Sequence, residues 1–471
     1  MSLVIVGMDN TIVNIALPAI RHDFKATLSD LQWTVDAYLL VLASLLMLSG
    51  STADRLGRRR TFQVGLAVFT LGSLLCSLAP DLRWLVAFRV LQAVGGSMLN
   101  PVAMSIISNV FTDARERAMA IGVWGGVFGL SMGLGPIVGG VLTESFSWRA
   151  IFWINLPIGL AAIVLTARFV PESRAERSRR LDLVGQALVA LVLAATTYAL
   201  IEAPRAGWVS AQTLGLLAVG VVAAVGLVRY EAHRSEPLID PRFFRSLPFS
   251  AASAIAVCGM AAFGGFLFVN TLYLQDVRGY SPLIAGVCTL PLAVFTTVLA
   301  PLSGRITGTH GPRVPMLVGG TGMALGGALL WGAGAGTALT RVLAAYVLFA
   351  IGFGMLNAPI TNTAVSGMPR SQAGVAAAVA STSRQVGAAL GVAVVGSVLN
   401  SATGGSLVEQ FRAAGDACWL VVAGLGVLVV LTARASTGMR ARASVARVAH
   451  LFDGDEDDGS QVLVPGRDPA V

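Results

Sequence analysis

Three polar residues lie close together in an otherwise apolar stretch near the start of the sequence. Asp9, Asn10 and Asn14 all fall within the segment MDNTIVNIALP, residues 8–18. On a helix they share one side. An acid at mid-bilayer costs roughly 2.5–3.5 kcal/mol even on a lenient insertion scale, so this side must face other helices or water. A carboxyl group held there can bind and release protons. The alternative is a structural Asp9 that caps a broken helix.

A second polar pair lies in another apolar stretch, RVLQAVGGSM, which places Arg89 and Gln92 one helical turn apart. A buried arginine needs a partner, and a carboxylate is the natural one. Burial disfavours the charged form of an acid, whereas a nearby guanidinium favours it. If the environment of Asp9 changes with conformation, the acid can take up a proton in one state and release it in another. A purely structural salt bridge between helices is the alternative.

Two more ionisable residues lie in apolar segments. Asp36, in WTVDAYLL, is expected near the external face and is a second candidate site for a proton or a cation. An ordinary interfacial acid explains it equally well. Arg384, in a late apolar stretch, could balance negative charge in a cavity or on a substrate.

The segment GSTADRLGRRR, which begins at Gly50, combines an acid with glycines and arginines at the end of an apolar stretch. Glycine lets backbones approach closely, and the acid can cap a neighbouring helix or pair with an arginine. We interpret the segment as a conformational latch, because a merely basic loop explains the arginines but neither the acid nor the glycine spacing. The latch residues are Gly50, Asp54, Arg55, Gly57, Arg58 and Arg59.

Glycines recur along GVWGGVFGLSMGLGPIVGG, residues 122–140. Those at 122, 126, 129, 133 and 140 keep to one face of a helix, so another helix can approach closely there. Pro136 interrupts the hydrogen-bond ladder of this helix. Static packing and a hinge or seal are both compatible with this spacing.

The elements that position these residues are expected to be membrane-spanning helices. The chain has 471 residues, of which 55% are hydrophobic and only 12% charged, too apolar for one soluble core. The apolar residues fall into blocks long enough to cross a bilayer. We predict an all-α polytopic membrane protein with fourteen transmembrane helices, near residues 1–20, 33–53, 62–80, 84–107, 119–142, 149–170, 182–202, 210–229, 248–272, 282–302, 313–333, 340–362, 374–400 and 417–434.

The distribution of basic residues predicts the orientation. With the first helix running outward, twenty-two arginines fall on the cytoplasmic side and eight basic residues on the other. Both termini are therefore expected to be cytoplasmic, and the first helix is a retained span rather than a cleaved signal peptide. This pattern explains the net charge of +8 better than nucleic-acid binding does. The four cysteines have no metal-ligand spacing, and we expect neither disulfides nor a metal site.

A faint internal repeat predicts the domain organisation. GSTADRLGRRR and GRITGTHGPR, from Gly304, share a glycine and arginine pattern after corresponding helices. This relates two six-helix halves, residues 1–170 and 248–434, and leaves residues 171–247 as a two-helix insert, a 6+2+6 arrangement. Residues 435–471 are predicted to be a mostly disordered tail.

Taken together, these motifs resemble the fourteen-helix drug:proton antiporter family of the major facilitator superfamily, the QacA/EmrB-like group. DNTIVNIALPAI, GSTADRLGRRR and RVLQAVGG are similar to its motifs in helix 1, loop 2–3 and helix 4. GLGPIVGG is similar to a helix-5 motif of antiporters, carried here by Gly133, Gly135, Pro136, Gly139 and Gly140. WRAIFWINLPIG and SRQVGAALGVAVVG are similar to signatures of helices 6 and 13.

The resemblance implies the major facilitator fold and an exporter, not an enzyme, that uses the proton gradient and needs no cofactor. No phosphate-binding loop of an ATP-driven pump is present in the sequence. Its expected partners are protons, a small amphiphilic drug or antibiotic and the lipid bilayer of a bacterial plasma membrane, and we expect a monomer. A dedicated exporter of one metabolite and a non-transporting sensor are the alternatives. The helix-5 motif disfavours an uptake symporter.

The sequence departs from the family pattern in three places. Gly308 stands where the second half would repeat Asp54, and Ala93 replaces a usual glycine of the helix-4 motif. Residues 282–302 contain no acid, whereas some relatives that export dications carry one in this helix. Dicationic substrates are therefore less expected.

Overall fold

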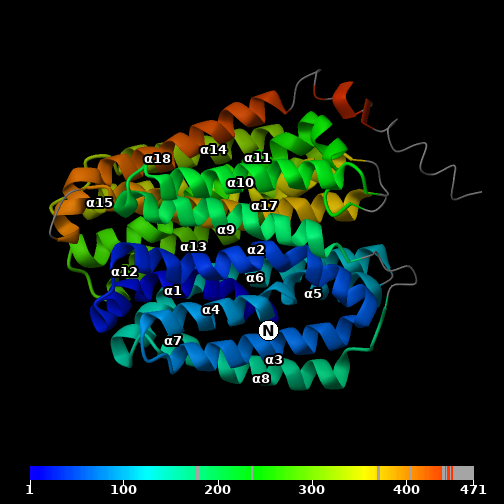
Figure 1. Ribbon diagram of the computed structural model, residues 1–471, viewed down its shortest axis with the longest axis horizontal. Helices are drawn as coiled ribbons and strands as arrows, with labels where there is room; N and C mark the ends of the chain where they lie inside the picture. Colours follow the sequence, from blue (N-terminus) through cyan, green and yellow to red (C-terminus); the bar gives the residue numbers. More distant parts are fainter. Residues whose placement is uncertain are drawn as a thin grey trace, which may run out of the picture.

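The structure is a bundle of long, roughly parallel and antiparallel helices (Figure 1). A computed structural model of the chain describes residues 1–111, 113–174, 181–234, 237–368, 372–402, 406–436 and, in the tail, 441, 443–445 and 447–448. Twelve helical segments within the described residues are long and apolar enough to cross a membrane. All regular elements of these residues are helical.

The first half contains eight helical pieces. They are α1 (Ser2–Phe24), α2 (Leu28–Leu56), α3 (Arg58–Ser77), α4 (Leu82–Ser97), α5 (Leu99–Val110), α6 (Ala114–Ser145), α7 (Ala150–Trp153) and α8 (Asn155–Phe169). Two short pieces are not separate crossings, because α4 leads into α5 through Met98, and α7 into α8 through Ile154. The blue-to-cyan helices in Figure 1 are this half.

The second half repeats the arrangement. It contains η1 (Pro241–Arg245), α11 (Leu247–Leu272) with the π-turn η2 (Tyr273–Val277), α12 (Pro282–Cys288), α13 (Leu290–His310), α14 (Arg313–Leu329), α15 (Leu339–Gly354), α16 (Asn357–Ser366), α17 (Ala373–Asn400) and α18 (Leu407–Ala435). Short interruptions again separate α12 from α13 and α15 from α16.

Prolines explain these four interruptions. Proline has no N–H to donate and clashes with the carbonyl four residues earlier, so the preceding turn of the helix opens. Each interruption is followed within about four residues by a proline in the next piece. These prolines are Pro101, Pro157, Pro291 and Pro359.

The predicted insert is a hairpin of α9 (Leu183–Ala206) and α10 (Ala211–Glu231). Helix α9 lies against α2 of the first half and α17 of the second (Figure 1). The Ser29 hydroxyl donates to the carbonyl of Ile201 at 3.5 Å, and the Ser397 hydroxyl donates to that of Leu200. The hairpin therefore covers the line along which the two halves meet.

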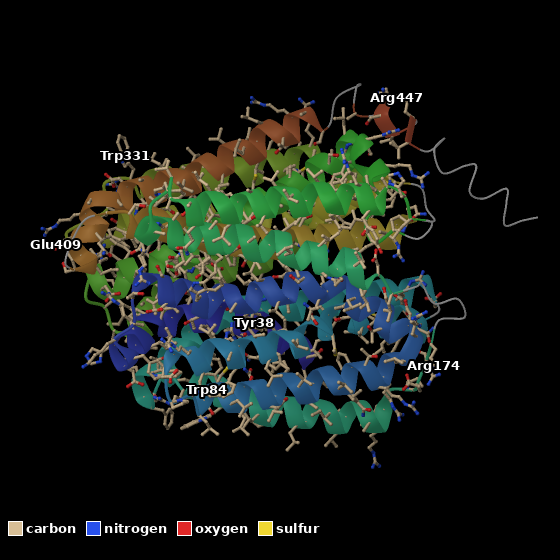
Figure 2. All side chains as sticks on the ribbon, in the orientation of Figure 1. Tyr38, Trp84, Arg174, Trp331, Glu409 and Arg447 are labelled. Carbon is tan, nitrogen blue, oxygen red and sulfur yellow. The ribbon has the colours of Figure 1, made fainter. Side chains whose placement is uncertain are left out.

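The two ends of the bundle differ in how closely the halves approach. We call the end at which α2 leads into α3, residues 54–60, the latch end, and the end at which α1 leads into α2, residues 24–28, the closed end. In Figure 2, Arg174 and Arg447 lie at the latch end, and Trp331 and Glu409 lie at the closed end.

The space around glycines along one face of α6 and of α17 shows this difference. A Cβ at Gly140 of α6 would lie 2.5 Å from the Pro282 carbonyl oxygen, and one at Gly133 would lie 2.5 Å from Ala293 Cβ. Gly126, two turns nearer the latch end on the same face, has no atom within 4 Å. On α17, Gly396 contacts Gln32 closely, whereas Gly374 has open space. The halves are therefore packed at the closed end and apart at the latch end.

The largest difference between a predicted helix boundary and the structure is at the start of α18. Helix α18 begins at Leu407, ten residues before the predicted 417, because Ser406 and Glu409 form a capping box that extends it beyond its apolar part. In the tail, predicted to be mostly disordered, the described residues from 441 to 448 are helical. There the Leu247 N–H donates to the Ser444 hydroxyl at 3.0 Å. The rest of the tail lies outside the described residues.

Candidate functional site

The central feature of the first half is a buried ion pair between Asp9 of α1 and Arg89 of α4. Arg89 Nη1 donates to Asp9 Oδ2 at 2.6 Å, and each residue is only 1% exposed. Gln92 joins both groups: its Nε2 donates to Asp9 Oδ1 at 2.9 Å, and its Oε1 accepts from Arg89 Nη1 at 2.6 Å. The structure thus brings together three residues that the sequence analysis selected from two distant segments.

Two further residues complete this network and were not selected from the sequence. The Gln92 amide also donates to the Ser73 hydroxyl at 2.7 Å, and the Asn155 amide donates to the same hydroxyl at 3.2 Å. Asn155 begins α8 and belongs to the signature WRAIFWINLPIG. The available signal was a polar residue within an apolar span. Ser73 gave no such signal, because a single serine in an apolar helix commonly bonds to its own backbone.

The rest of the Arg89 side chain is also held in place. Its Nε donates to the Thr34 carbonyl at 3.3 Å, and its guanidinium lies 4.2 Å from the centroid of the Tyr38 ring. A desolvated cation gains from the negative face of an aromatic ring. Helix α2 therefore stabilises the positive charge, and α1 supplies the only acid that is paired with it in the described residues.

The other polar residues of the α1 stripe lie beside the network rather than in it. The Asn14 amide donates to the Asn10 carbonyl at 3.3 Å. The side-chain oxygens of both asparagines are buried and have no hydrogen-bond partner among the described residues. They are free to accept a hydrogen bond from a ligand or from water.

Asp36 is fully buried on α2, and neither of its carboxylate oxygens has a hydrogen-bond partner among the described residues. In this state the carboxylate is therefore shielded from solvent. Gln32, one turn earlier, donates to the carbonyls of Val392 and Ala393 on α17 at 3.3 and 3.0 Å. Since residues four apart share a helix face, Asp36 lies on the side of α2 that meets the second half.

Arg384 lies on α17 in the second half, apart from the Asp9 network. Its Nη1 donates to the Thr361 hydroxyl at 3.2 Å, and its Nη2 to the Ser381 hydroxyl at 3.1 Å. Both bonds are to neutral groups, which leave its positive charge available to an anionic ligand.

The predicted antiporter motif lies where α6 packs against α1 of its own half and α12 of the second half. A Cβ at Gly135 would lie 2.0 Å from the Thr11 hydroxyl, and one at Gly139 would lie 2.7 Å from Ile12, both on α1. On the neighbouring face, a Cβ at Gly286 of α12 would lie 2.4 Å from the Pro136 carbonyl oxygen. Helix α6 thus links the helix that carries Asp9 to the second half, and only glycine allows these approaches.

In the predicted latch, Asp54 pairs with an arginine, one of the two roles expected for it, and a second acid, Glu172, lies at the start of α3. Asp54 accepts two bonds from Arg58, at 3.0 and 3.2 Å, within its own segment. Glu172, just beyond the first half, caps α3 by accepting from the backbone N–H groups of Arg59 and Arg60. Gly57 has a φ of +113°, and a Cβ there would lie 2.6 Å from Glu172 Oε1. Arg55 is exposed, and a Cβ at Gly50 would meet no atom of another element within 4 Å.

Two helical halves are packed together at one end and apart at the other, and the first half contains a buried ion pair. These features are those of a multi-pass membrane transporter. Residues 1–392 match the family model of the Major Facilitator Superfamily. The chain belongs to this superfamily, and the resemblance found in its motifs is confirmed.

Among curated relatives, the chain is 38% identical over 418 residues to the Tetracenomycin C resistance and export protein of Streptomyces glaucescens, covering 88% of this chain and 77% of the relative. It is 37% identical over 400 residues to the Multidrug resistance protein Stp of Mycobacterium tuberculosis, covering 85% and 74%. Among solved structures, it is similar to a bacterial homologue of the human lysosomal transporter Spinster in an inward-facing conformation. That likeness has a TM-score of 0.62 with 18% identity over 96% of each chain, and it extends to the fold.

Proposed function

We propose that this protein is a proton-coupled antiporter that exports amphiphilic drugs or antibiotics from the cytoplasm by alternating access. The observation that carries the proposal is the buried network of Asp9, Arg89 and Gln92. The guanidinium of Arg89 and the amide of Gln92 donate to the Asp9 carboxylate and stabilise its negative charge. Protonation of Asp9 would remove half of the ion pair, so occupancy by a proton and the arrangement of α1 and α4 depend on each other.

The difference between the two ends supports alternating access. In this state the halves are packed at the closed end and apart at the latch end. The bias of arginine residues toward the latch-end loops supports a cytoplasmic latch end with both termini on that side. The state described here is then open to the cytoplasm. Rocking of the halves would separate α6 from α12 and α13 at the closed end and bring the halves together at the latch end. Asp54 and its neighbours would be the contact that changes.

We propose the fourteen-helix, 6+2+6 arrangement, with α6 and α14 as crossings in addition to the twelve apolar segments. The two halves of a single copy enclose the transport path, so the protein works as a monomer. Proton influx would be the sole energy source, without a cofactor. The membrane potential alone supplies ~2.3 kcal/mol for each charge moved through 100 mV.

The names of the relatives support the substrate class, since they describe resistance to and export of drugs and antibiotics. Asp36, buried and without a partner on the face of α2 that meets the second half, would serve as a second proton or cation site. Arg384 would pair with negative charge on a substrate.

The test uses purified protein in liposomes with an imposed pH gradient and rhodamine 6G as a fluorescent amphiphile. We expect gradient-driven extrusion from wild type and its loss in Asp9→Asn. Asp416→Asn is the matched control, because Asp416 is an exposed acid whose one hydrogen bond, from the Gly332 N–H at 2.7 Å, an asparagine oxygen can keep. Extrusion that survives in Asp9→Asn, or accumulation of dye together with protons, would refute the antiport mechanism.

A dedicated exporter of one compound is the second candidate, because some relatives are named for resistance to a single antibiotic. Transport of a panel of unrelated amphiphiles separates the two. A broad exporter moves several members of the panel, whereas a dedicated exporter moves one structural class.

A further inference from the structure

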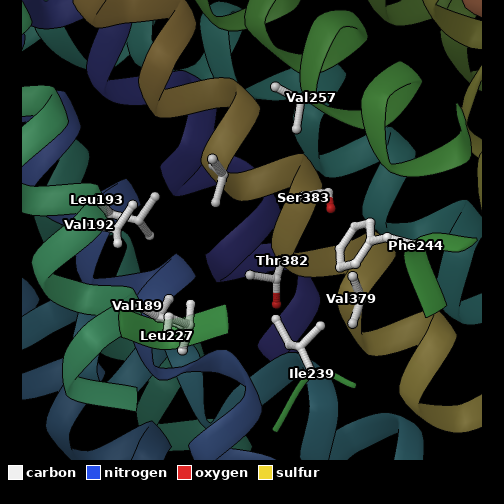
Figure 3. Close-up of a pocket in the computed structure, with 11 residues that line it drawn as sticks. Val189, Val192, Leu193, Leu227, Ile239, Phe244, Val257, Val379, Thr382 and Ser383 are labelled. Atoms are coloured by element: carbon white, nitrogen blue, oxygen red, sulfur yellow. The ribbon is translucent and has the colours of Figure 1, made fainter. Parts of the chain in front are cut away.

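A cavity of about 200 Å³ lies between the insert hairpin and the second half, away from the Asp9 network (Figure 3). Its walls come from α9 and α10, from the linker and η1, and from α11 and α17. Representative lining residues are Val192, Leu227, Phe244, Val257 and Thr382. The contributing parts of α9 and α17 lie in their latch-end portions, so the cavity is in the latch-end half of the bundle.

Thr382 and Ser383 are the polar residues that line this mostly apolar cavity. Thr382 is 7% exposed, and its hydroxyl has no hydrogen-bond partner among the described residues. Some helical threonines of this chain donate their hydroxyl to the carbonyl four residues earlier, as Thr34, Thr307 and Thr432 do at 2.6–3.0 Å. Others, such as Thr197 and Thr363, have no partner among the described residues. In Figure 3 the Thr382 hydroxyl points instead into the space between Ile239 and Leu227. A buried hydroxyl without a partner costs free energy, which a ligand with a polar group would recover.

Helix α17 separates this cavity from Arg384. Thr382 and Val386 lie one turn apart and line the cavity, whereas Arg384, two residues from each, projects from the opposite face toward Thr361 of α16. The outer surface of the hairpin carries exposed apolar residues such as Val222, 71% exposed, as expected for a surface in lipid. The cavity therefore lies between the lipid-facing hairpin and the wall of the second half.

We propose that this cavity is a binding site for the exported compound on the membrane side of α17, where an amphiphile from the latch-end leaflet places an apolar group and hydrogen-bonds to Thr382. The proposal rests on the proposed function for its substrate class. An apolar cavity of roughly 150 Å³ can hold benzene, so this one holds a single ring with a small substituent. The site thus anchors part of the compound. A lipid acyl chain would fill the space but leave the Thr382 hydroxyl unpaired.

The experiment measures equilibrium binding of rhodamine 6G to the protein in lipid nanodiscs and its efflux from liposomes. Val192→Phe fills the cavity from α9, and Leu227→Phe fills it from α10. Thr382→Val keeps the side-chain shape and removes the hydroxyl. Val222→Phe adds the same bulk as Val192→Phe on the outer surface of the hairpin and is the control.

We expect the two filling variants to weaken binding and to raise the KM of efflux about tenfold at an unchanged maximal rate. Thr382→Val should raise KM about threefold and also raise the melting temperature of the ligand-free protein, since it removes an unsatisfied buried hydroxyl. Val222→Phe should match wild type in all measurements.

Binding and KM values of the filling variants equal to those of Val222→Phe would overturn the proposal. An effect of the filling variants without any effect of Thr382→Val would also overturn it, because the dye would then bind without the hydrogen bond to Thr382. If wild type binds the dye but does not extrude it under a pH gradient, the proposed function fails. The side site would still be supported by loss of binding in the filling variants.

Discussion

The two halves bury different chemistry in corresponding helices. In the first half, α4 carries Arg89 and Gln92, which hold the Asp9 carboxylate. In the second half, α15 carries aromatic residues in the same region. Its Phe349 and Phe353 stack on Phe266 and Phe263 of α11, with centroids 4.2 and 4.0 Å apart. One half is therefore built around a charge and the other around apolar surfaces.

On the proposed function, this difference would give the two halves separate tasks. A proton site needs a buried ionisable group whose charge depends on its surroundings, whereas an amphiphilic compound needs apolar surface with few polar groups. The polar contact on α15 is neutral: Tyr346 donates to the Asn270 side chain. We therefore expect substitutions in the first half to change coupling to protons, and those in the second half to change substrate affinity or stability.

The largest effect is expected for Arg89→Leu, which leaves Asp9 as an unpaired buried charge. Breaking such a pair costs about 3–5 kcal/mol, so the melting temperature should fall sharply. The double variant Asp9→Asn with Arg89→Leu removes the orphaned charge and should recover much of the stability, but not gradient-driven transport. A double variant no more stable than Arg89→Leu would indicate that the charge itself is unimportant.

The next effect concerns the two ends of α6. Gly140→Val would force α6 away from Pro282 at the closed end, whereas Gly126→Val has open space in this state and would clash only when the latch end closes. Both variants should slow efflux, by roughly tenfold or more if each blocks one conformation.

Accessibility distinguishes these two variants. Cysteines are introduced at the two ends and labelled with a membrane-impermeant maleimide. Labelling at the closed end should increase in Gly140→Val, whereas Gly126→Val should keep the labelling pattern of the present state. The same shift in both would contradict a rocking motion.

In the second half, Tyr346→Phe tests the neutral contact. The variant leaves the Asn270 oxygen without its hydroxyl donor, which costs about 1–3 kcal/mol of stability. The dependence of efflux on the pH gradient should match wild type, since no charge changes. A changed pH profile would mean that proton coupling extends into this half.

The smallest effect is expected at the latch end. Glu172→Gln removes the charge that caps α3 and should cost about 0.3–1 kcal/mol, whereas Asp54→Asn weakens a partly exposed ion pair worth about 0–1 kcal/mol. We expect melting curves to rank Glu172→Gln as the less stable variant. The opposite order would mean that the Asp54–Arg58 pair contributes more to stability in this state than the Glu172 cap does.

Much of the fold was predictable because lipid imposes a simple rule. Each apolar block long enough to cross the bilayer must form a helix, and the predicted spans agree with the helices at most boundaries. The start of α18 was missed because a polar capping box carries no apolar signal. The pairing of Asp9 with Arg89 was expected because each needs a partner in an apolar environment.

The sequence by itself determined which segments cross the membrane and which buried charges must meet, because unpaired charge and unpaired backbone are costly in lipid. Only the tertiary structure decided that Ser73 and Asn155 join the network, that Glu172 rather than Asp54 caps α3, and that the Thr382 hydroxyl points into a cavity. These depend on how helices rotate and pack against one another, which is set by many small contacts between residues far apart in the chain.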